Sequence, residues 1–145
     1  MLATMTLASC TAIVTGGNSG IGAAIAGALA GAGVRTVIAG RREDKNTATA
    51  RRLQEEHGTD TLAVTTDVSR EDDCERLVRT AIEKFGRLDI LVNNAGIGAH
   101  GTIAHTASDE FDRVLKTNLY GTFWCSRAAF RAMQERGGPG AIINI

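Results

Sequence analysis

The stretch that decides the fold is Thr11-Ala12-Ile13-Val14-Thr15-Gly16-Gly17-Asn18-Ser19-Gly20-Ile21-Gly22. Its first five residues are apolar or β-branched, which is typical of a strand buried in a parallel sheet. A glycine-rich loop follows at once, and the Ala-rich residues 21–30 after it predict a helix that packs closely on the sheet. This order of elements indicates a site for a phosphate-bearing ligand, because a helix N-terminus presents bare N–H groups to an anion.

Strand-like and helix-like segments go on alternating along the chain. We expect further strands at residues 36–39, 62–64, 88–92 and 141–145, and helices at residues 43–57, 70–85 and 107–136. Ser69-Arg70-Glu71-Asp72 resembles a capping box, so Ser69 is expected to cap the third helix. The pattern predicts a doubly wound, Rossmann-like α/β fold: a parallel sheet of about five strands with flanking helices. We expect a single domain, residues 1–145, that is incomplete at its C-terminus because later strands of such a sheet are missing.

The composition gives no sign of a highly charged partner. Sixteen acidic residues balance sixteen basic ones, so we expect neither nucleic acid nor a membrane surface to be bound. No apolar stretch approaches the roughly 18–20 residues that a membrane-spanning helix needs. Cys10, Cys74 and Cys125 show no spacing typical of a metal site. We therefore expect no metal, and three reduced, mostly buried thiols in a cytoplasmic protein.

The glycines of the first loop suit the approach of a phosphate group. Gly16, Gly20 and Gly22 carry no side chains that would block the backbone, and glycine allows a turn that would strain other residues. Their spacing is three residues and then one, whereas the commoner dinucleotide fingerprint has one and then two. A tight strand-to-helix turn without a ligand remains the alternative interpretation.

The end of the second predicted strand bears on which dinucleotide is bound. NAD-binding folds usually place a carboxylate there for the ribose 2′-hydroxyl. This chain has Gly40 followed by Arg41 and Arg42, and a guanidinium can grip a 2′-phosphate with two hydrogen bonds. The pattern favours NADP over NAD, with ordinary solvated surface arginines as the alternative.

Polar residues also close the third and fourth predicted strands. Asp67 could accept a hydrogen bond from an adenine amino group, or it could be a turn residue ahead of Ser69. Asn93 and Asn94 could bond to loop backbone beside a cofactor, or their role could be purely structural.

Asn118 is predicted to lie in the middle of a long helix. Asn is less favourable there than Ala by roughly 0.7 kcal/mol. Its neighbours Leu115 and Leu119 belong to an apolar stripe that we expect to be buried, together with Phe111, Val114 and Phe123. A polar amide beside such a stripe needs a partner, which favours a functional role.

Four segments of the chain together resemble the short-chain dehydrogenase/reductase family: residues 15–22, Asp67-Val68, residues 91–96 and residues 118–121. The resemblance runs from about residue 7 to residue 145. It implies that the first loop cradles a pyrophosphate, that Asp67 touches adenine and that an arginine at Arg41 marks NADP-preferring members. It implies as well that the Asn-Asn-Ala-Gly segment stabilises the sheet beside the cofactor and that Asn118 holds a water in a proton relay. The candidate cofactor-binding residues are Gly16, Asn18, Ser19, Gly20, Ile21, Gly22, Arg41, Arg42, Asp67, Val68, Asn94, Ala95 and Gly96, and Asn118 is the candidate catalytic residue.

The family's remaining catalytic residues have no counterpart in this chain. The resemblance implies a Ser beyond the last predicted strand and then a Tyr-x-x-x-Lys pair on the next helix, and residues 1–145 contain neither. Tyr120 is the only tyrosine, and Trp124 stands four positions after it in place of Lys. His57, His100 and His105 are expected to be poor substitutes, since His57 ends a helix and the other two lie in a loop.

The resemblance implies the cofactor-binding N-terminal half of an NADP-dependent oxidoreductase, which moves a hydride between nicotinamide and a small carbonyl or alcohol substrate. The chain by itself is expected to be inactive, because it has no proton donor of the family's kind. A second hypothesis is a non-catalytic NADP(H)-binding or regulatory protein. It would pair with a relative, or with a second copy, through the helix at residues 107–136. A truncated or wrongly assigned reading frame is the third.

Overall fold

The computed structural model describes residues 6–145, which build a five-stranded parallel sheet in the order β3-β2-β1-β4-β5. The strands are β1 (Thr11–Thr15), β2 (Arg35–Gly40), β3 (Thr61–Thr65), β4 (Ile90–Asn93) and β5 (Ala141–Asn144). The chain leaves β1 toward β2 and β3 and then returns to place β4 on the other side of β1. The predicted doubly wound, Rossmann-like sheet is confirmed, and its reversal point lies between β1 and β4.

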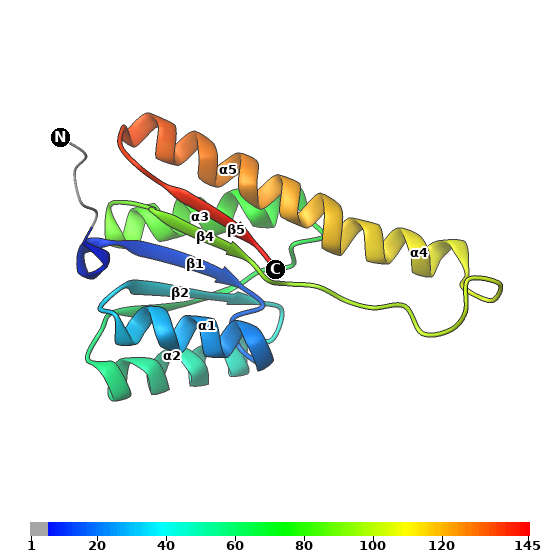
Figure 1. Ribbon diagram of the computed structural model, residues 1–145, viewed down its shortest axis with the longest axis horizontal. Coiled ribbons are helices and arrows are strands. Elements are labelled where there is room, and N and C mark those ends of the chain that lie inside the picture. Colours follow the sequence, from blue (N-terminus) through cyan, green and yellow to red (C-terminus); the bar gives the residue numbers. More distant parts are fainter. Residues whose placement is uncertain (1–5) are drawn as a thin grey trace.

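Helices cover both faces of this sheet. The elements are a short 3-10 turn (Leu7–Ser9), α1 (Gly20–Gly31), α2 (Glu43–His57), α3 (Glu71–Phe85), α4 (Ser108–Leu115), a π-helical turn (Lys116–Tyr120) and α5 (Gly121–Arg136). Figure 1 shows α1 and α2 on one side of the sheet and α3 and α5 on the other, with α4 extending beyond the sheet. Right-handed crossovers between parallel strands produce this two-sided arrangement.

The core has two layers because successive residues of a strand point to opposite faces. Ile13 joins the cluster formed with Leu77 of α3 and Ala129 of α5. Its neighbours on either side, Ala12 and Val14, belong instead to the cluster formed with α1 and α2. Every residue of β1 is buried, which is why this strand reads as one continuous apolar run.

The expected Ser69 cap is wrong. The N-cap of α3 is Arg70, and it makes no side-chain capping bond. The Ser69 hydroxyl donates instead to Asp67 Oδ1 at 2.7 Å, and the Ser69 amide donates to the same oxygen at 3.0 Å. The helix begins one residue later than expected, and the charge-assisted bond to Asp67 orients the Ser69 hydroxyl within the turn before it.

The expected single helix at residues 107–136 is interrupted, and its apolar stripe is not buried. The π-helical turn separates α4 from α5. Phe111, Leu119 and Phe123 are 55–57 % exposed. The side of α5 that packs on the sheet is defined instead by Cys125, Ala129 and Met133. Val114 and Leu115 are half-buried. The prediction failed for the other three side chains because α4 and the π-helical turn lie beyond the sheet (Figure 1) and α5 turns other residues toward it.

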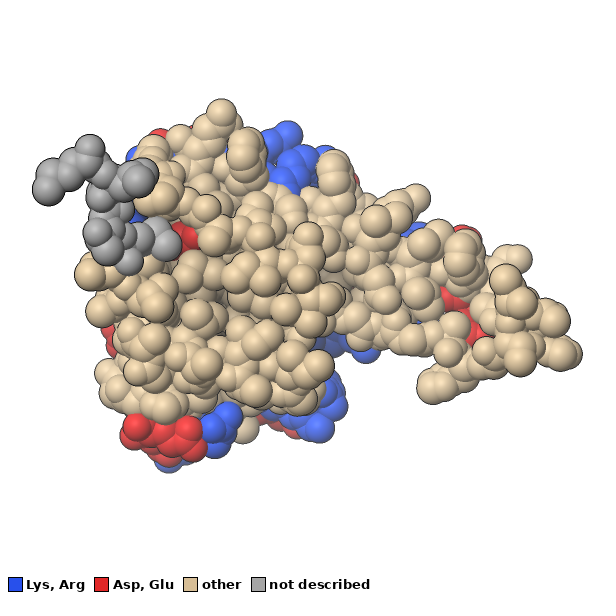
Figure 2. All heavy atoms as spheres, viewed as in Figure 1, with Lys and Arg blue, Asp and Glu red and all other residues tan. Residues whose placement is uncertain are grey.

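The three cysteines are free and buried, as predicted. A hydrogen bond with Cys74, together with burial, raises the pKa of Cys125 far above its ordinary value. Within residues 6–145 no group of three His, Cys, Asp or Glu side chains is placed to hold a metal ion. No helix in the same part of the chain has the length and apolar character to cross a bilayer. Residues other than Lys, Arg, Asp and Glu make up most of the face seen in Figure 2.

A buried carboxylate joins the strands at the end of the sheet where β1 and β4 begin. Asp89 is 0 % exposed and accepts the Thr11 amide at 2.9 Å. Arg87 donates to both of its oxygens at 2.7 and 2.8 Å, and Arg136 lies 3.2 Å away. Burial raises the pKa of Asp89, but the bonds from Arg87 and Thr11 and the charges of both arginines outweigh it. The net pKa therefore lies below its ordinary value.

We predict that Asp89→Asn lowers the free energy of unfolding by about 2–3 kcal/mol at pH 7, because it leaves two arginines without their counter-charge. Denaturant unfolding measures the loss, and Asp60→Asn, at an exposed position, is the control with little expected effect. Because the folded-state pKa of Asp89 is depressed, its contribution is full above about pH 4 and is lost as the pH falls through the lower folded value. A gap between wild type and variant that widens below pH 4 would contradict this assignment.

Candidate functional site

A cavity of about 580 Å³ lies at the carboxyl ends of the strands, beside the reversal point between β1 and β4. Open parallel sheets bind ligands at this place. Twelve of the thirteen predicted cofactor-binding residues line the cavity; Gly20 does not. The remaining lining residues are Ala39, Gly40, Thr66, Ile97 and Thr117. Loops from four different strands therefore converge on one site.

The glycine-rich loop leaves the N-terminus of α1 uncovered at this cavity. Ser19 is the N-cap of α1 but makes no side-chain capping bond, so the first N–H groups of the helix keep their bonding capacity. Ile21 and Gly22 of the first turn line the cavity. A Cβ at Gly22 would overlap the Gly16 carbonyl oxygen and the Asn94 amide. The tight packing therefore requires glycine at position 22.

A buried hydroxyl joins the loop after β1 to the segment after β4. Thr15 Oγ1 donates to Val92 O at 3.3 Å and accepts the amides of Asn94 and Ala95 at 3.0 and 3.1 Å. The Asn94 side chain donates in turn to Thr15 O at 3.0 Å and Gly16 O at 3.3 Å. Asn94 thus bonds to loop backbone, the first of the two roles that its sequence position allowed.

Asn93 has the structural role instead. Its amide donates to Asn144 of β5 and to Ser126 of α5, both at 2.9 Å. It does not line the cavity. Two adjacent asparagines therefore point to opposite sides of the sheet, as the two-residue period of a strand dictates.

Asn118 has a partner, but it is exposed and not buried as expected. Its amide makes a two-way pair with the backbone of Ile97, accepting from N and donating to O at 2.9 Å each. It does not line the cavity itself, whereas Ile97 and the adjacent Thr117 do. The π-helical turn at residues 116–120 places Asn118 here, and such turns occur frequently at functional sites.

Two arginines supply positive charge at the mouth of the cavity. Arg42 donates to Asn18 Oδ1 at 3.3 Å and to Ser19 Oγ at 3.4 Å, which ties it to the glycine-rich loop. Arg41 is exposed and lines the same cavity. Both guanidinium groups belong to the short link between β2 and α2, and no carboxylate lines the cavity on that link.

Asp67 serves as a turn residue and also lines the cavity. Its carboxylate accepts from Ser69, and its own amide donates to Asp73 Oδ2 at 2.9 Å. That backbone hydrogen bond lowers the pKa of Asp73, and Arg76 lowers it further against the opposing effect of burial. Asp73 therefore stays ionised and holds this stretch of backbone against the cavity.

Sequence reasoning missed the Thr15 hydroxyl and Asn46, a buried residue in the first turn of α2 that bonds to Asn18. The sequence does contain a signal for Thr15, because a polar residue that ends an apolar strand and precedes the glycines is a candidate for bonding to the loop. No sequence pattern singles out Asn46 as a buried residue, because the other residues of its helix are mostly polar and exposed. Its burial depends on the neighbouring strand ends.

None of the three histidines lines the cavity. His57 is the last residue of α2, and its ring lies 3.8 Å from Glu56. His105 pairs with Thr102 at 2.9 Å within the exposed loop before α4. All three therefore lie outside the cavity lining, and their expected unsuitability as catalytic acids stays a prediction.

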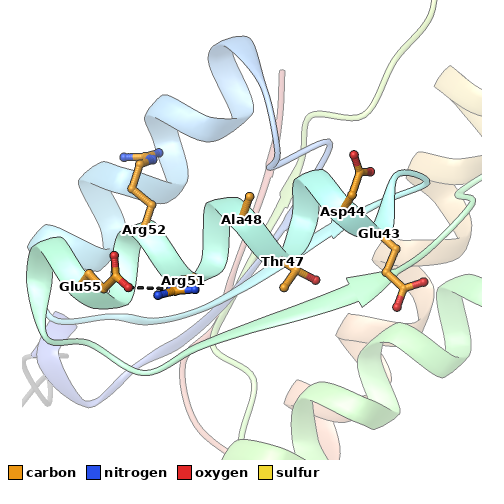
Figure 3. Close-up of a pocket in the computed structure, with 7 residues that line it drawn as sticks. All are labelled: Glu43, Asp44, Thr47, Ala48, Arg51, Arg52 and Glu55. Carbon is orange, nitrogen blue, oxygen red and sulfur yellow. Dashed lines mark hydrogen bonds and ion pairs between the residues drawn. The ribbon is translucent and has the colours of Figure 1, made fainter.

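A larger hollow of about 840 Å³ runs along the outer side of α2 and is not a candidate site. Figure 3 shows that its lining residues all come from this one helix, with the exposed Arg51–Glu55 pair at 2.7 Å among them. An exposed ion pair of neighbouring helix turns contributes little. No strand end reaches this surface.

We predict that Gly22→Ala lowers the free energy of unfolding by about 1–3 kcal/mol, because its Cβ collides with the Gly16 carbonyl and the Asn94 amide. Gly27→Ala in the same helix is the matched control: its Cβ would meet only Leu53 Cδ2 at 3.6 Å. The control should be stabilised by about 0.5–1 kcal/mol through helix propensity. Denaturant unfolding of both variants checks the contrast, and equal effects would argue against the tight packing at position 22.

Comparison with known proteins agrees with this geometry. Residues 10–145 match the family model described as short chain dehydrogenase. An uncharacterized oxidoreductase from Thermotoga maritima is 42% identical over 134 residues, which cover 92% of this chain and 52% of the relative. The chain thus spans about half the length of the curated relatives it matches.

Solved structures show the same fold. A short-chain type dehydrogenase/reductase from Mycobacterium marinum superposes with a TM-score of 0.89 at 32% identity, over 93% of this chain and 54% of that one. An alcohol dehydrogenase from the archaeon Thermococcus sibiricus, complexed with 5-hydroxy-NADP, gives a TM-score of 0.85 at 30% identity, over 92% and 57%. The sheet order, the glycine-rich loop and these matches together lead to one conclusion: the chain belongs to the short-chain dehydrogenase family.

Proposed function

We propose that the cavity binds a nicotinamide dinucleotide, with NADP(H) preferred over NAD(H), as the coenzyme site of an oxidoreductase. The observation that carries the proposal is the uncapped N-terminus of α1, packed so tightly on Gly16 and Asn94 that only glycine fits at position 22. Members of the short-chain dehydrogenase family bind nicotinamide coenzymes. A cavity of about 580 Å³ is within the usual range for such ligands.

The pyrophosphate would be held at the first turn of α1. Its N–H groups are not used by a side-chain cap, and the positive end of the helix dipole favours an anion there. Gly16, Gly20 and Gly22 leave this backbone bare, and Asn18, Ser19 and Ile21 form the rest of the cradle. Gly20 contributes through the turn and not as a lining residue.

The preference for the phosphorylated coenzyme rests on Arg41 and Arg42. Both line the cavity after β2, where the acidic residue typical of NAD-binding sites is replaced by Gly40. Guanidinium groups pair with phosphate through two hydrogen bonds. The NADP derivative held by the Thermococcus relative supports this choice.

The remaining residues are proposed to receive the two ends of the coenzyme. Asp67 and Val68 would contact the adenine, while Asn94, Ala95 and Gly96 would lie beside the nicotinamide half. Asn118 holds the Ile97 backbone in place there and would retain a water for proton transfer. When bound, the coenzyme supplies the hydride, and these residues orient it.

For the whole protein we propose reversible hydride transfer between the nicotinamide and a small substrate, to a carbonyl carbon in one direction and from an alcohol carbon in the other. The 145-residue chain forms one coenzyme-binding domain, and by itself it should bind coenzyme without turning over substrate. General acid–base help is worth typically about 10²- to 10⁴-fold, and residues 1–145 contain no Tyr-x-x-x-Lys motif to supply it. The one tyrosine, Tyr120, packs its ring against that of Trp124, with the two ring centroids 5.6 Å apart. Steady reduction of a carbonyl compound by the purified chain would contradict this.

We predict that Arg41→Asp raises the Kd for NADPH by about 10- to 100-fold, because it removes a guanidinium that donates hydrogen bonds to the 2′-phosphate and adds a negative charge that repels it. The Kd for NADH should change far less. Coenzyme fluorescence titration measures both constants. Arg52→Asp reverses a charge farther along α2, outside the 580 Å³ cavity, and should leave both constants unchanged. Equal weakening of NADPH and NADH by Arg41→Asp would overturn the preference.

A second role, pairing with another copy or a relative, is favoured by the exposed apolar side of the α4–α5 region. Leu119, Phe123 and Phe130 recur at helical spacing and are 56–59 % exposed. Contiguous exposed apolar residues of this kind mark interaction surfaces. We propose that this side, within residues 107–136, pairs with its counterpart in a second molecule.

We predict that wild-type chain associates in a concentration-dependent way and that Phe130→Glu abolishes the association, since it places a charge in the apolar contact. Sedimentation velocity measures the oligomeric state. Arg51→Glu, on the exposed side of α2, is the control and should associate like the wild type. A wild-type chain that stays monomeric at all concentrations would refute self-pairing.

A further inference from the structure

We propose that Asn46 is a positioning residue for coenzyme selectivity: its buried amide holds Asn18, and Asn18 orients Arg42 at the cavity that would receive a 2′-phosphate. The inference rests on the proposed function and adds a residue that does not itself line the cavity. Asn46 lies in the first turn of α2 and is 0 % exposed.

Two strand ends set the orientation of the Asn46 amide. Its Nδ2 donates to Gly40 O of β2 at 2.7 Å and to Val64 O of β3 at 3.3 Å. Carbonyl oxygens only accept, so the NH₂ group must face them and Oδ1 must face the other way. That oxygen meets Asn18 of the glycine-rich loop.

The side-chain amide of Asn18, oriented by Asn46, in turn orients Arg42. Asn18 Nδ2 donates to Asn46 Oδ1 at 2.6 Å, which turns Asn18 Oδ1 toward Arg42. Arg42 Nη2 donates to that oxygen at 3.3 Å and to Ser19 Oγ at 3.4 Å. Because each amide has one donor side and one acceptor side, fixing the first fixes the second. Asn18 and Arg42 both line the cavity.

The missing side chain of Gly40, at the end of β2, leaves room for the relay of hydrogen bonds from Asn46 through Asn18 to Arg42. A Cβ at Gly40 would lie 2.6 Å from Asn18 Nδ2 and 2.9 Å from Asn46 Oδ1. Any side chain at position 40 would therefore force the two amides apart. Gly40 has an ordinary strand conformation, so the close approach of the amides, and not a special backbone angle, requires glycine there.

The hydrogen bonds that Asn46 makes to β2 and β3 do not by themselves explain why a polar residue is buried at this position. Gly40 O also accepts the Thr66 amide at 2.9 Å, and Val64 O also accepts Thr66 Oγ1 at 3.2 Å. Both strand-end carbonyls keep a donor when Asn46 is replaced by an apolar residue of similar size. Asn46→Leu therefore removes mainly the link to Asn18.

The test is a double-mutant cycle on the full chain with Asn46→Leu, Asn18→Ala and the double variant. Calorimetry compares 2′,5′-ADP with 5′-AMP, which differ only in the 2′-phosphate, and thermal unfolding is followed in parallel. We expect Asn46→Leu to weaken 2′,5′-ADP binding by about 10-fold and 5′-AMP binding by less than about 2-fold. In the Asn18→Ala background the same change should have no further effect on 2′,5′-ADP binding.

Thr49→Val, a buried position one turn farther along α2, is the control and should leave both affinities unchanged. A loss that is equal for the two nucleotides, or losses that add in the double variant, would overturn the relay. Should Asn46→Leu not fold, Asn18→Ala must lower the preference for 2′,5′-ADP by itself, and an unaltered preference would overturn the proposal. A wild-type chain that binds neither nucleotide refutes the proposed function too, whereas a preference that survives Asn46→Leu overturns this inference alone.

Discussion

The close contact between the loop after β1 and the segment after β4 is the constraint on which the site depends. Gly22 packs on the Gly16 carbonyl and the Asn94 amide. Thr15 Oγ1, at the end of β1, bonds to Val92 O of β4 and to the Asn94 amide that follows it. The contact exists only because the chain returns from β3 to place β4 beside β1. It holds the first turn of α1 open at the reversal point of the sheet.

The two ends of the sheet use charge in opposite ways. At the end where the strands begin, Asp89 is fully buried and balanced by Arg87 and Arg136, which satisfies the charges within the protein. At the carboxyl end Arg41 and Arg42 lie at a cavity that carries no carboxylate on the β2–α2 link. The first arrangement stabilises the fold, and the second leaves positive charge available to a ligand.

The failures of prediction have a common cause. Local pattern placed Ser69 as a cap and residues 111–123 on a buried stripe, but the Ser69 hydroxyl bonds to the Asp67 carboxylate and α4 projects beyond the sheet. Asn46 was missed for the same reason, since its polar helix gave no sign that two strand ends would bury it. Each outcome depended on residues distant in sequence or on the extent of the sheet, and neither is visible in a short window.

What the sequence by itself determined is the order of strands and helices, the position of the glycine-rich loop and the residues that meet at the carboxyl ends. Apolar runs, glycines and polar strand ends are local signals, and parallel strands bring their carboxyl ends to one edge. Only the tertiary structure decided which side chains bond there: Asn94 to the loop and Asn93 to β5, Asn118 to Ile97, and Asn46 to Asn18. An amide's partner depends on distance and direction in three dimensions, which no spacing along the chain specifies.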